Sequence, residues 1–198
     1  MTSLAESRSL ASSVISDRPA SRLFWGFALA LLGTALLTIS AKTKVPMWPV
    51  DISLQTMVVL LIGATYGSRL AVGTLLLYLA EGATGLPVFQ GTPERGLGLA
   101  YMVGPTGGYL IGFVAAAGLV GWAADRGWSR DPFKLFAVML VASVLILALG
   151  AAWLAYLFGA EKAFALGVAP FVFGDLVKAG LAAALVPAVW SLIGRFRR

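Results

Sequence analysis

The sequence predicts an all-α polytopic membrane protein, with six transmembrane helices in one bundle and both termini in the cytoplasm. Two observations predict this class. The 198 residues are 59% hydrophobic and only 12% charged, with a mean hydropathy of +0.88, whereas soluble domains are about 45–50% apolar and about 25% charged. The apolar residues also gather in runs of spanning or near-spanning length, separated by segments rich in charge, glycine or proline.

The N-terminal segment, residues 1–22, is rich in Ser and Arg, which predicts a mobile cytoplasmic tail. The first apolar run, 23–41, is longer than a signal-peptide core of roughly 7–15 residues and matches the roughly 20 residues that span a bilayer. The next runs, 52–67 and 70–82, are near or below the spanning limit. They fit two thin helices or a re-entrant pair, and we favour helices because irregular backbone at membrane depth needs special burial.

A Gly- and Pro-rich loop at 83–103 is long enough to be functional rather than a mere connection. Three further spans are expected after it, at residues 104–124, 133–158 and 168–194. A polar turn at 125–132 and a connector at 159–167 join them. The predicted organisation is therefore a six-helix membrane domain over 23–194, followed by a basic cytoplasmic tail, 195–198.

Lysine and arginine are distributed unevenly about the predicted bilayer. With both termini inside, the inner segments hold ten of them: Arg8, Arg18, Arg22, Arg69, Arg126, Arg130, Lys134, Arg195, Arg197 and Arg198. The outer loops hold four, Lys42, Lys44, Arg95 and Lys162, and Lys178 lies within the membrane. An excess of Lys and Arg on the cytoplasmic side is the usual bias of membrane proteins. Topology thus accounts for the net charge of +6, and no nucleic-acid partner is expected.

Several chemistries are excluded by what the sequence lacks. It contains no Cys and no His, so disulfides and thiolate nucleophiles are excluded, and zinc or haem sites are disfavoured. It also contains no Gly-Lys dipeptide, so there is no Walker A loop to hold ATP. We expect a protein that is not an enzyme, has no cofactor or metal, and depends on other chains for any ATP-driven step.

Asp175 and Lys178 stand inside the last apolar run, in FGDLVKAG. A spacing of three places both on one face of a helix. One interpretation is an ion pair that locks two helices together. The other is a ligand site, because ionisable groups at membrane depth cost on the order of 2.5–3.5 kcal/mol, usually face the bundle interior and are commonly functional. We favour the ligand site.

Other polar and small residues are weaker candidates. Glu81 lies at the outer end of the third span, where an interfacial carboxylate or a ligand contact would fit. Gln55 and Ser53 begin the second span as hydrogen-bonding or capping groups. The segment from Gly104 to Tyr109 lets backbone approach a ligand or a neighbouring helix. Small residues recur every four positions in the first span, at Gly26, Ala30 and Thr34, which favours close helix contact in lipid.

Four motifs together resemble one family, the biotin-specific substrate-capture subunits (S components) of energy-coupling factor (ECF) vitamin transporters. They are PVDISLQT (49–56), GLPVF (85–89), GPTGGYLIGF (104–113) and PFVFGDLVK (170–178). The resemblance implies a six-helix bundle in a prokaryotic inner membrane that captures biotin from outside. It also implies a transmembrane coupling protein and two cytoplasmic ATPases as partners, with Gly26, Ala30 and Thr34 facing the coupling protein.

The resemblance and the chemistry of biotin together define an expected binding site. Biotin has a carboxylate on an apolar chain, a ureido ring with N–H donors and a carbonyl, and a thioether. Lys178 suits the carboxylate, whereas Asp175 suits a ureido N–H or holds Lys178 in place. The remaining expected substrate-binding residues are Tyr109, Thr106, Gly107, Gln55, Phe89, Tyr101, Glu81, Arg95 and Trp48.

Two other functions fit parts of the sequence. An autonomous secondary carrier of a small carboxylated solute would use Asp175 or Glu81 as a proton site, although we find no inverted repeat in the sequence. An intramembrane aspartyl hydrolase would need two carboxylates that share a site, and the last span contains one.

Overall fold

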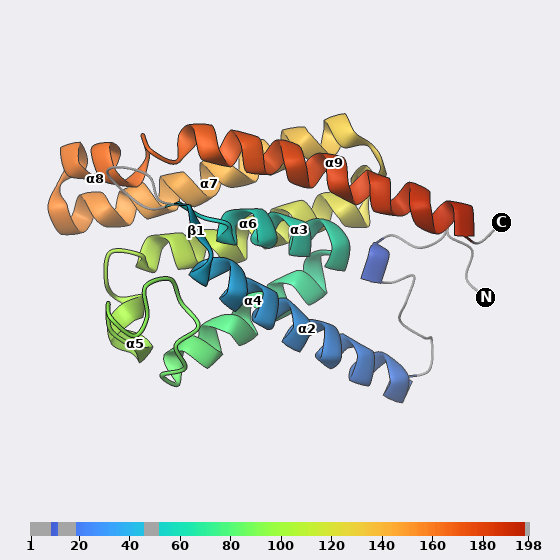
Figure 1. Cartoon of the computed structure of the whole chain (residues 1–198), viewed down its shortest axis with the longest axis horizontal. Coiled ribbons are helices and arrows are strands. Elements are labelled where there is room, and N and C mark those ends of the chain that lie inside the picture. Colours follow the sequence, from blue (N-terminus) through green and yellow to red (C-terminus); the bar gives the residue numbers. More distant parts are fainter. Residues whose placement is uncertain (1–8, 12–18, 46–51, 197–198) are drawn as a thin grey trace.

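Helices form most of the chain in the computed structural model, which describes residues 9–11, 19–45 and 52–196. The long helices are α2 (Pro19–Lys42), α6 (Gly107–Asp125), α7 (Pro132–Phe158) and α9 (Val172–Phe196). The shorter ones are α3 (Gln55–Tyr66), α4 (Ser68–Ala83), α5 (Gly98–Met102), the 3-10 turn η1 (Trp128–Arg130) and α8 (Ala160–Gly167). In Figure 1, α7 and α9 lie along one edge, α2 and α4 along the other, and α3 and α6 between them.

Four of the described helices are long and apolar enough to cross a membrane, namely α2, α6, α7 and α9. The ambiguous runs after the first span form two separate helices, of 12 and 16 residues. Gly67 joins them with a positive φ of 76°, a conformation that disfavours residues with a Cβ. The carboxylate of Asp125, at the end of α6, accepts hydrogen bonds from the backbone N–H and hydroxyl of Ser68 and so caps α4.

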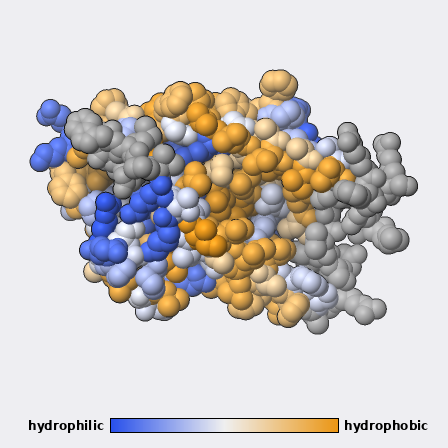
Figure 2. Space-filling view, viewed as in Figure 1, coloured by the Kyte–Doolittle hydropathy of each residue, from blue (hydrophilic) through white to orange (hydrophobic). Residues whose placement is uncertain are grey.

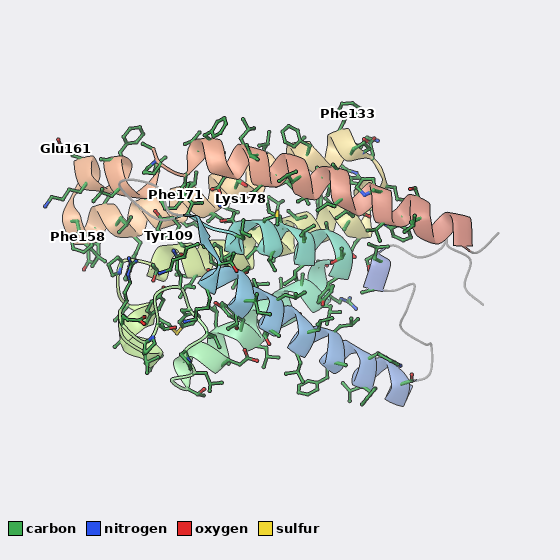
Figure 3. All side chains as sticks on the ribbon, in the orientation of Figure 1. Tyr109, Phe133, Phe158, Glu161, Phe171 and Lys178 are labelled. Atoms are coloured by element: carbon green, nitrogen blue, oxygen red, sulfur yellow. The ribbon has the colours of Figure 1, made fainter. Side chains whose placement is uncertain are left out.

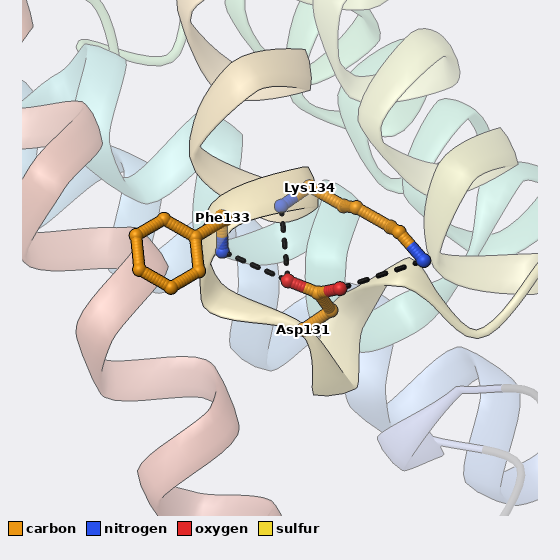
Figure 4. Close-up of polar contacts among 3 residues, drawn as sticks. All are labelled: Asp131, Phe133 and Lys134. Carbon is orange, nitrogen blue, oxygen red and sulfur yellow. Dashed lines mark hydrogen bonds and ion pairs between the residues drawn. The ribbon is translucent and has the colours of Figure 1, made fainter.

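Helix α7 shows how local sequence sets a helix boundary (Figure 4). The Asp131 carboxylate accepts from the backbone N–H groups of Phe133 and Lys134 at 3.0 and 3.2 Å, and Pro132 occupies the first helical position. Both features are strong helix-start signals. The Lys134 ammonium adds an ion pair to Asp131 at 3.5 Å.

Helix α6 is the centre of the packing, in contact with α3, α4 and α7. Its buried face is rich in small residues, including Ala116, Ala117 and Gly108. A Cβ at Gly108 would lie 2.4 Å from the Leu149 carbonyl oxygen, so glycine is needed for α7 to approach this closely.

The outer faces of the long helices are apolar. Large exposed side chains include Phe27 and Leu32 on α2, Val144 on α7, and Leu181 and Leu185 on α9. Figure 2 shows apolar side chains over much of one face, with hydrophilic side chains gathered near the end that carries α5. A membrane-embedded helix satisfies its own backbone and presents apolar side chains to lipid, so this surface fits a bilayer.

The structure corrects several sequence predictions. Residues 159–167, predicted as a connector, contain the helix α8, and the predicted loop 83–103 includes α5. Helix α2 begins at Pro19, inside the predicted tail, and α9 continues to Phe196, inside the predicted C-terminal tail. The all-α prediction also missed a short antiparallel pair, β1 (Lys44–Val45) with β2 (Ile52–Ser53).

Candidate binding site

A cavity of about 390 Å³ lies at one end of the bundle. The first turns of α3, α6 and α9 meet there with the last turns of α7, the helix α8 and the loop after α4. Its lining residues are Ser53, Gln55, Thr56, Phe89, Gln90, Arg95, Tyr101, Pro105, Thr106, Tyr109, Leu110, Phe113, Ile146, Leu147, Leu154, Phe158, Lys162, Ala163, Leu166, Phe171 and Asp175. Most are apolar, and a few polar groups converge, as in small-molecule sites.

The charged pair of α9 is buried at this cavity. Asp175 is 3% exposed and Lys178 is 6% exposed, and the Lys178 ammonium donates to Asp175 Oδ1 at 3.1 Å. Asp175 lines the cavity, whereas Lys178, labelled in Figure 3, does not. Both residues belong to α9, so the pair does not itself join two helices. It presents a carboxylate to the cavity, with its counter-charge held one turn further along.

Helix α9 suits an acid at its start. Asp175 occupies the first turn, where the positive end of the helix dipole stabilises negative charge. The space on the other side of this turn is taken by β2, since a Cβ at Gly174 would lie 3.3 Å from Ile52 Cδ1. The short strand pair therefore packs against the turn that carries the acid.

A chain of hydrogen bonds orients Gln55, another polar residue that lines the cavity. Gln55 Nε2 donates to Tyr78 Oη at 2.9 Å, and Tyr78 Oη donates to the Val88 carbonyl at 2.8 Å. All three residues are buried. One N–H of the Gln55 amide is thus engaged, which leaves its second N–H and its carbonyl for other partners.

The loop after α4 is held over the cavity by aromatic packing. Phe89 stacks on Tyr101 with ring centroids 5.0 Å apart, and its edge contacts Tyr78 at 5.3 Å. Gly82 makes room for this ring, because a Cβ there would lie 2.0 Å from Phe89 Cζ. Tyr101 donates to the Gln90 carbonyl at 2.7 Å, and burial raises the pKa of its hydroxyl, which stays a donor.

Two further contacts fix the rim. Lys42, at the end of α2, donates to the Thr92 carbonyl at 2.6 Å and to the Thr92 hydroxyl at 2.8 Å. Tyr109 donates to the Gly167 carbonyl at 2.6 Å. The loop and α8 are therefore each tied to a long helix.

The cavity brings together only part of the predicted site. Asp175, Tyr109, Thr106, Gln55, Phe89, Tyr101 and Arg95 line it. Lys178 lies behind Asp175. Gly107 is not in the lining, and its missing Cβ instead lets the Met102 carbonyl approach. Glu81 is also outside the lining, because its carboxylate accepts from Thr34 on α2 at 3.0 Å. Trp48 lies outside the described residues.

The small-residue stripe of α2 is largely turned into the chain. Ala30 is 8% exposed and Thr34 is 3% exposed, and Thr34 bonds to α4. Gly26 is half-exposed, and no atom lies within 4 Å of a Cβ built there. The buried part of the stripe thus packs α2 against α4. Of the three residues predicted to face a coupling protein, only Gly26 is accessible for such a contact.

Sequence reasoning missed the α7 and α8 sides of the cavity. Ile146 and Leu147 come from a run that read only as a membrane span, and no signal marked them as site residues. Lys162 lies in the segment predicted as a connector, and the sequence analysis counted it only as an outer-loop charge. A helical period of 3.6 would have placed Lys162 and Leu166 on one face.

The matches to known proteins agree with this geometry. The model of the BioY family matches residues 13–195 of the chain. The chain belongs to the BioY family. The similarity predicted from the four motifs is confirmed, and each motif contributes lining residues to the cavity, at 53–56, 89, 105–113 and 171–175. Segments that are far apart in the sequence therefore meet at one site.

Curated relatives in the family match most of the chain. The "Probable biotin transporter BioY" of Pyrococcus horikoshii is 38% identical over 155 residues, which cover 78% of this chain and 90% of that protein. The "Biotin transporter BioY" of Thermotoga maritima is 36% identical over 152 residues, or 76% and 86% of the two chains.

A solved structure shares the fold. It is the crystal structure of the S-component for biotin from an ECF-type ABC transporter, with a TM-score of 0.75. The match covers 89% of this chain and 95% of that one, at 23% identity.

Proposed function

We propose that this BioY family member takes up biotin, capturing it with high affinity from outside a prokaryotic inner membrane as the S component of an ECF-type importer. Family membership and relatives that carry the name biotin transporter support biotin as substrate. The observation that carries the proposal is the buried Asp175 carboxylate on the wall of a mostly apolar cavity.

We assign each polar group of biotin a partner in the cavity. Asp175 accepts a ureido N–H, while its carboxylate stays paired with the Lys178 ammonium at 3.1 Å. Gln55 and Thr106 offer polar partners to the rest of the ureido ring, and the aromatic pair Phe89 and Tyr101 covers the apolar body. Burying a polar group without a partner costs free energy, so a guest that pairs with these groups is preferred over a purely apolar one.

The proposed topology has six spans with both termini inside. In Figure 1, the start of α2 and the end of α9 lie at one end of the molecule, and α5 and α8, which flank the cavity, lie at the other. With the tails inside, the cavity opens outward, and ten of the 15 Lys and Arg residues fall on the inner side. Helices α3 and α4, shorter than a full span, complete the six.

The chain lacks an ATP-binding loop, so uptake needs other subunits. We infer a transmembrane coupling protein and two cytoplasmic ATPases as partners. Biotin binding by this chain alone would survive removal of the ATPases, whereas concentrative uptake would not. Undiminished uptake by the isolated chain, abolished by a protonophore at constant ATP, would instead indicate an autonomous secondary carrier.

Equilibrium binding of labelled biotin to the purified chain tests the proposal directly. Unlabelled biotin should displace the label, and other vitamins such as thiamine and riboflavin should not. Equal displacement by all three vitamins, or no saturable biotin binding, would contradict it.

A further inference from the structure

The charges around the cavity do not balance. Three charged residues line it, namely Asp175, Arg95 and Lys162. The Asp175 charge is matched by Lys178 at 3.1 Å, outside the lining. Within the described ranges, neither Arg95 nor Lys162 has a carboxylate within ion-pair distance. Among the residues that the structure describes, the cavity wall therefore carries more positive than negative charge, and the two cations have no anionic partner.

Lys162 is held at the rim by the geometry of α8. The helix starts after Gly159, which has a positive φ of 90°, and its buried side carries Ala163 and Gly167. The Tyr109 hydroxyl holds the Gly167 carbonyl at 2.6 Å and so fixes the end of the helix. Lys162 and Leu166, four residues apart, both line the cavity.

The neighbouring residue on the same helix behaves differently. Glu161 is exposed and does not line the cavity, and Figure 3 shows it pointing away from the body of the molecule. Of the two adjacent charges of α8, the helix thus directs the cation to the cavity and the anion to the surroundings.

Arg95 reaches the cavity from a different element. Its stem folds back on its own turn, where the Arg95 backbone N–H donates to the Gly91 carbonyl at 2.8 Å and a Cβ at Gly91 would collide with Arg95 Cδ. Arg95 is exposed, as Lys162 is, but the packing of its stem on Gly91 directs the guanidinium along its own loop. Lys162, on a flexible four-carbon stem in an exposed position, is free to reach a guest.

We propose that Lys162 is a substrate-binding residue that pairs with the carboxylate of the guest and makes the cavity prefer an anionic ligand to its neutral analogue. The inference rests on biotin as the proposed substrate. With Asp175 engaged by Lys178 and facing the ureido ring, the carboxylate of a guest in this apolar cavity meets its counter-charge at the α8 rim. Exposed ion pairs are weak, so the contribution is a moderate one to affinity and specificity.

The experiment compares biotin with biotinamide, in which a neutral amide replaces the carboxylate. Both are titrated against the full chain in lipid nanodiscs, for wild type, Lys162→Gln, Lys162→Glu, Lys162→Arg and the matched control Glu161→Gln. Lys162→Gln should weaken biotin binding by about three- to fivefold, the value of one exposed ion pair, and Lys162→Glu by about tenfold because it adds repulsion. Biotinamide binding should stay unchanged in all variants, which also shows that they are folded.

Two further readouts separate a charge contact from packing. Lys162→Arg should retain the preference for biotin over biotinamide, and Glu161→Gln should leave both affinities unchanged. Raising the salt concentration should weaken biotin binding to wild type more than to Lys162→Gln.

A loss of less than twofold for biotin in Lys162→Glu, or an equal loss for both ligands, would overturn the assignment of Lys162 and leave biotin capture standing. Wild-type protein that binds neither ligand would overturn both proposals.

Discussion

At the scale of single residues, the arrangement of Asp175 and Lys178 is the central feature. Both are buried, and each is the other's partner at 3.1 Å. Removing one member of a buried pair leaves an unpaired charge and costs on the order of 3–5 kcal/mol, whereas replacing both with neutral groups can be tolerated. Stability and binding therefore respond differently to single and double substitutions.

Substituting Lys178→Ala should lower both the melting temperature and the biotin affinity, because the carboxylate loses its counter-charge. The double variant Asp175→Asn/Lys178→Met should recover most of the melting temperature but not the affinity. Thermal unfolding in detergent and titration with labelled biotin measure the two effects. An affinity of Lys178→Ala within threefold of wild type would remove this residue from the site.

Asp131 caps the start of α7 with its carboxylate. The backbone N–H of Lys134, above all, lowers the pKa of this carboxyl, and the Phe133 N–H and the Lys134 ammonium add to the effect. A lowered pKa means that the folded state favours the charged form, so the stabilisation is present above the unfolded pKa and is lost as pH falls through the folded value.

The melting temperature of wild type should therefore exceed that of Asp131→Ala at neutral pH, and the difference should shrink below about pH 4, near the unperturbed pKa of Asp. The measurement is thermal unfolding of both proteins from pH 7 to pH 3. A difference that is constant over this range would show that the charge of Asp131 has no part in the cap.

At the scale of elements, the loop after α4 depends on contacts with other helices. It supplies Phe89, Gln90 and Arg95 to the cavity, and Lys42 ties it to α2 through Thr92. Thr92 is 5% exposed but Lys42 is exposed, so the bond to the Thr92 carbonyl is only partly shielded from water. Lys42 does not line the cavity. We therefore expect its bond to Thr92 to slow the opening of the loop, and so the dissociation of the ligand, rather than to contact the ligand.

Lys42→Met should accelerate biotin dissociation by about two- to tenfold, which corresponds to the net value of one typical hydrogen bond, about 0.5–1.5 kcal/mol. Lys42→Arg should restore part of the slow dissociation. The matched control is Lys44→Met, two residues away on β1, which is exposed and does not line the cavity. Stopped-flow displacement of labelled biotin measures the rates, and equal acceleration by both Met variants would contradict the role of the tie.

At the scale of the whole molecule, topology is the property that connects the cavity to transport. The sequence contains no Cys, so a thiol reagent will label only a cysteine that is introduced. Glu94→Cys places a thiol in the exposed loop beside the cavity, and Arg126→Cys places one at the opposite end, after α6.

A membrane-impermeant maleimide should label Glu94→Cys in intact cells and should label Arg126→Cys only after the cells are opened. The reason is that Lys and Arg bias puts the end with Arg126 inside. Labelling of Arg126→Cys in intact cells, with Glu94→Cys protected, would reverse the proposed orientation.

The sequence by itself determined the class of the protein and most of its helices. Apolar content and run length depend only on local composition, so α2, α6, α7 and α9 were predicted to within a few residues. The four family motifs were also readable, because they are short and contiguous. Segment 159–167 was missed as a helix because its length and its charges are typical of a connector.

Only the tertiary structure decided which polar groups share the cavity. Asp175 and Glu81 are both carboxylates in apolar helices, yet α9 turns one to the cavity and α4 turns the other to Thr34. Lys162, from α8, reaches the rim, whereas Lys178 stands behind its partner. Hydropathy is a property of each stretch of chain, whereas the direction of a side chain depends on how neighbouring helices pack and rotate, so the first can be predicted locally and the second cannot.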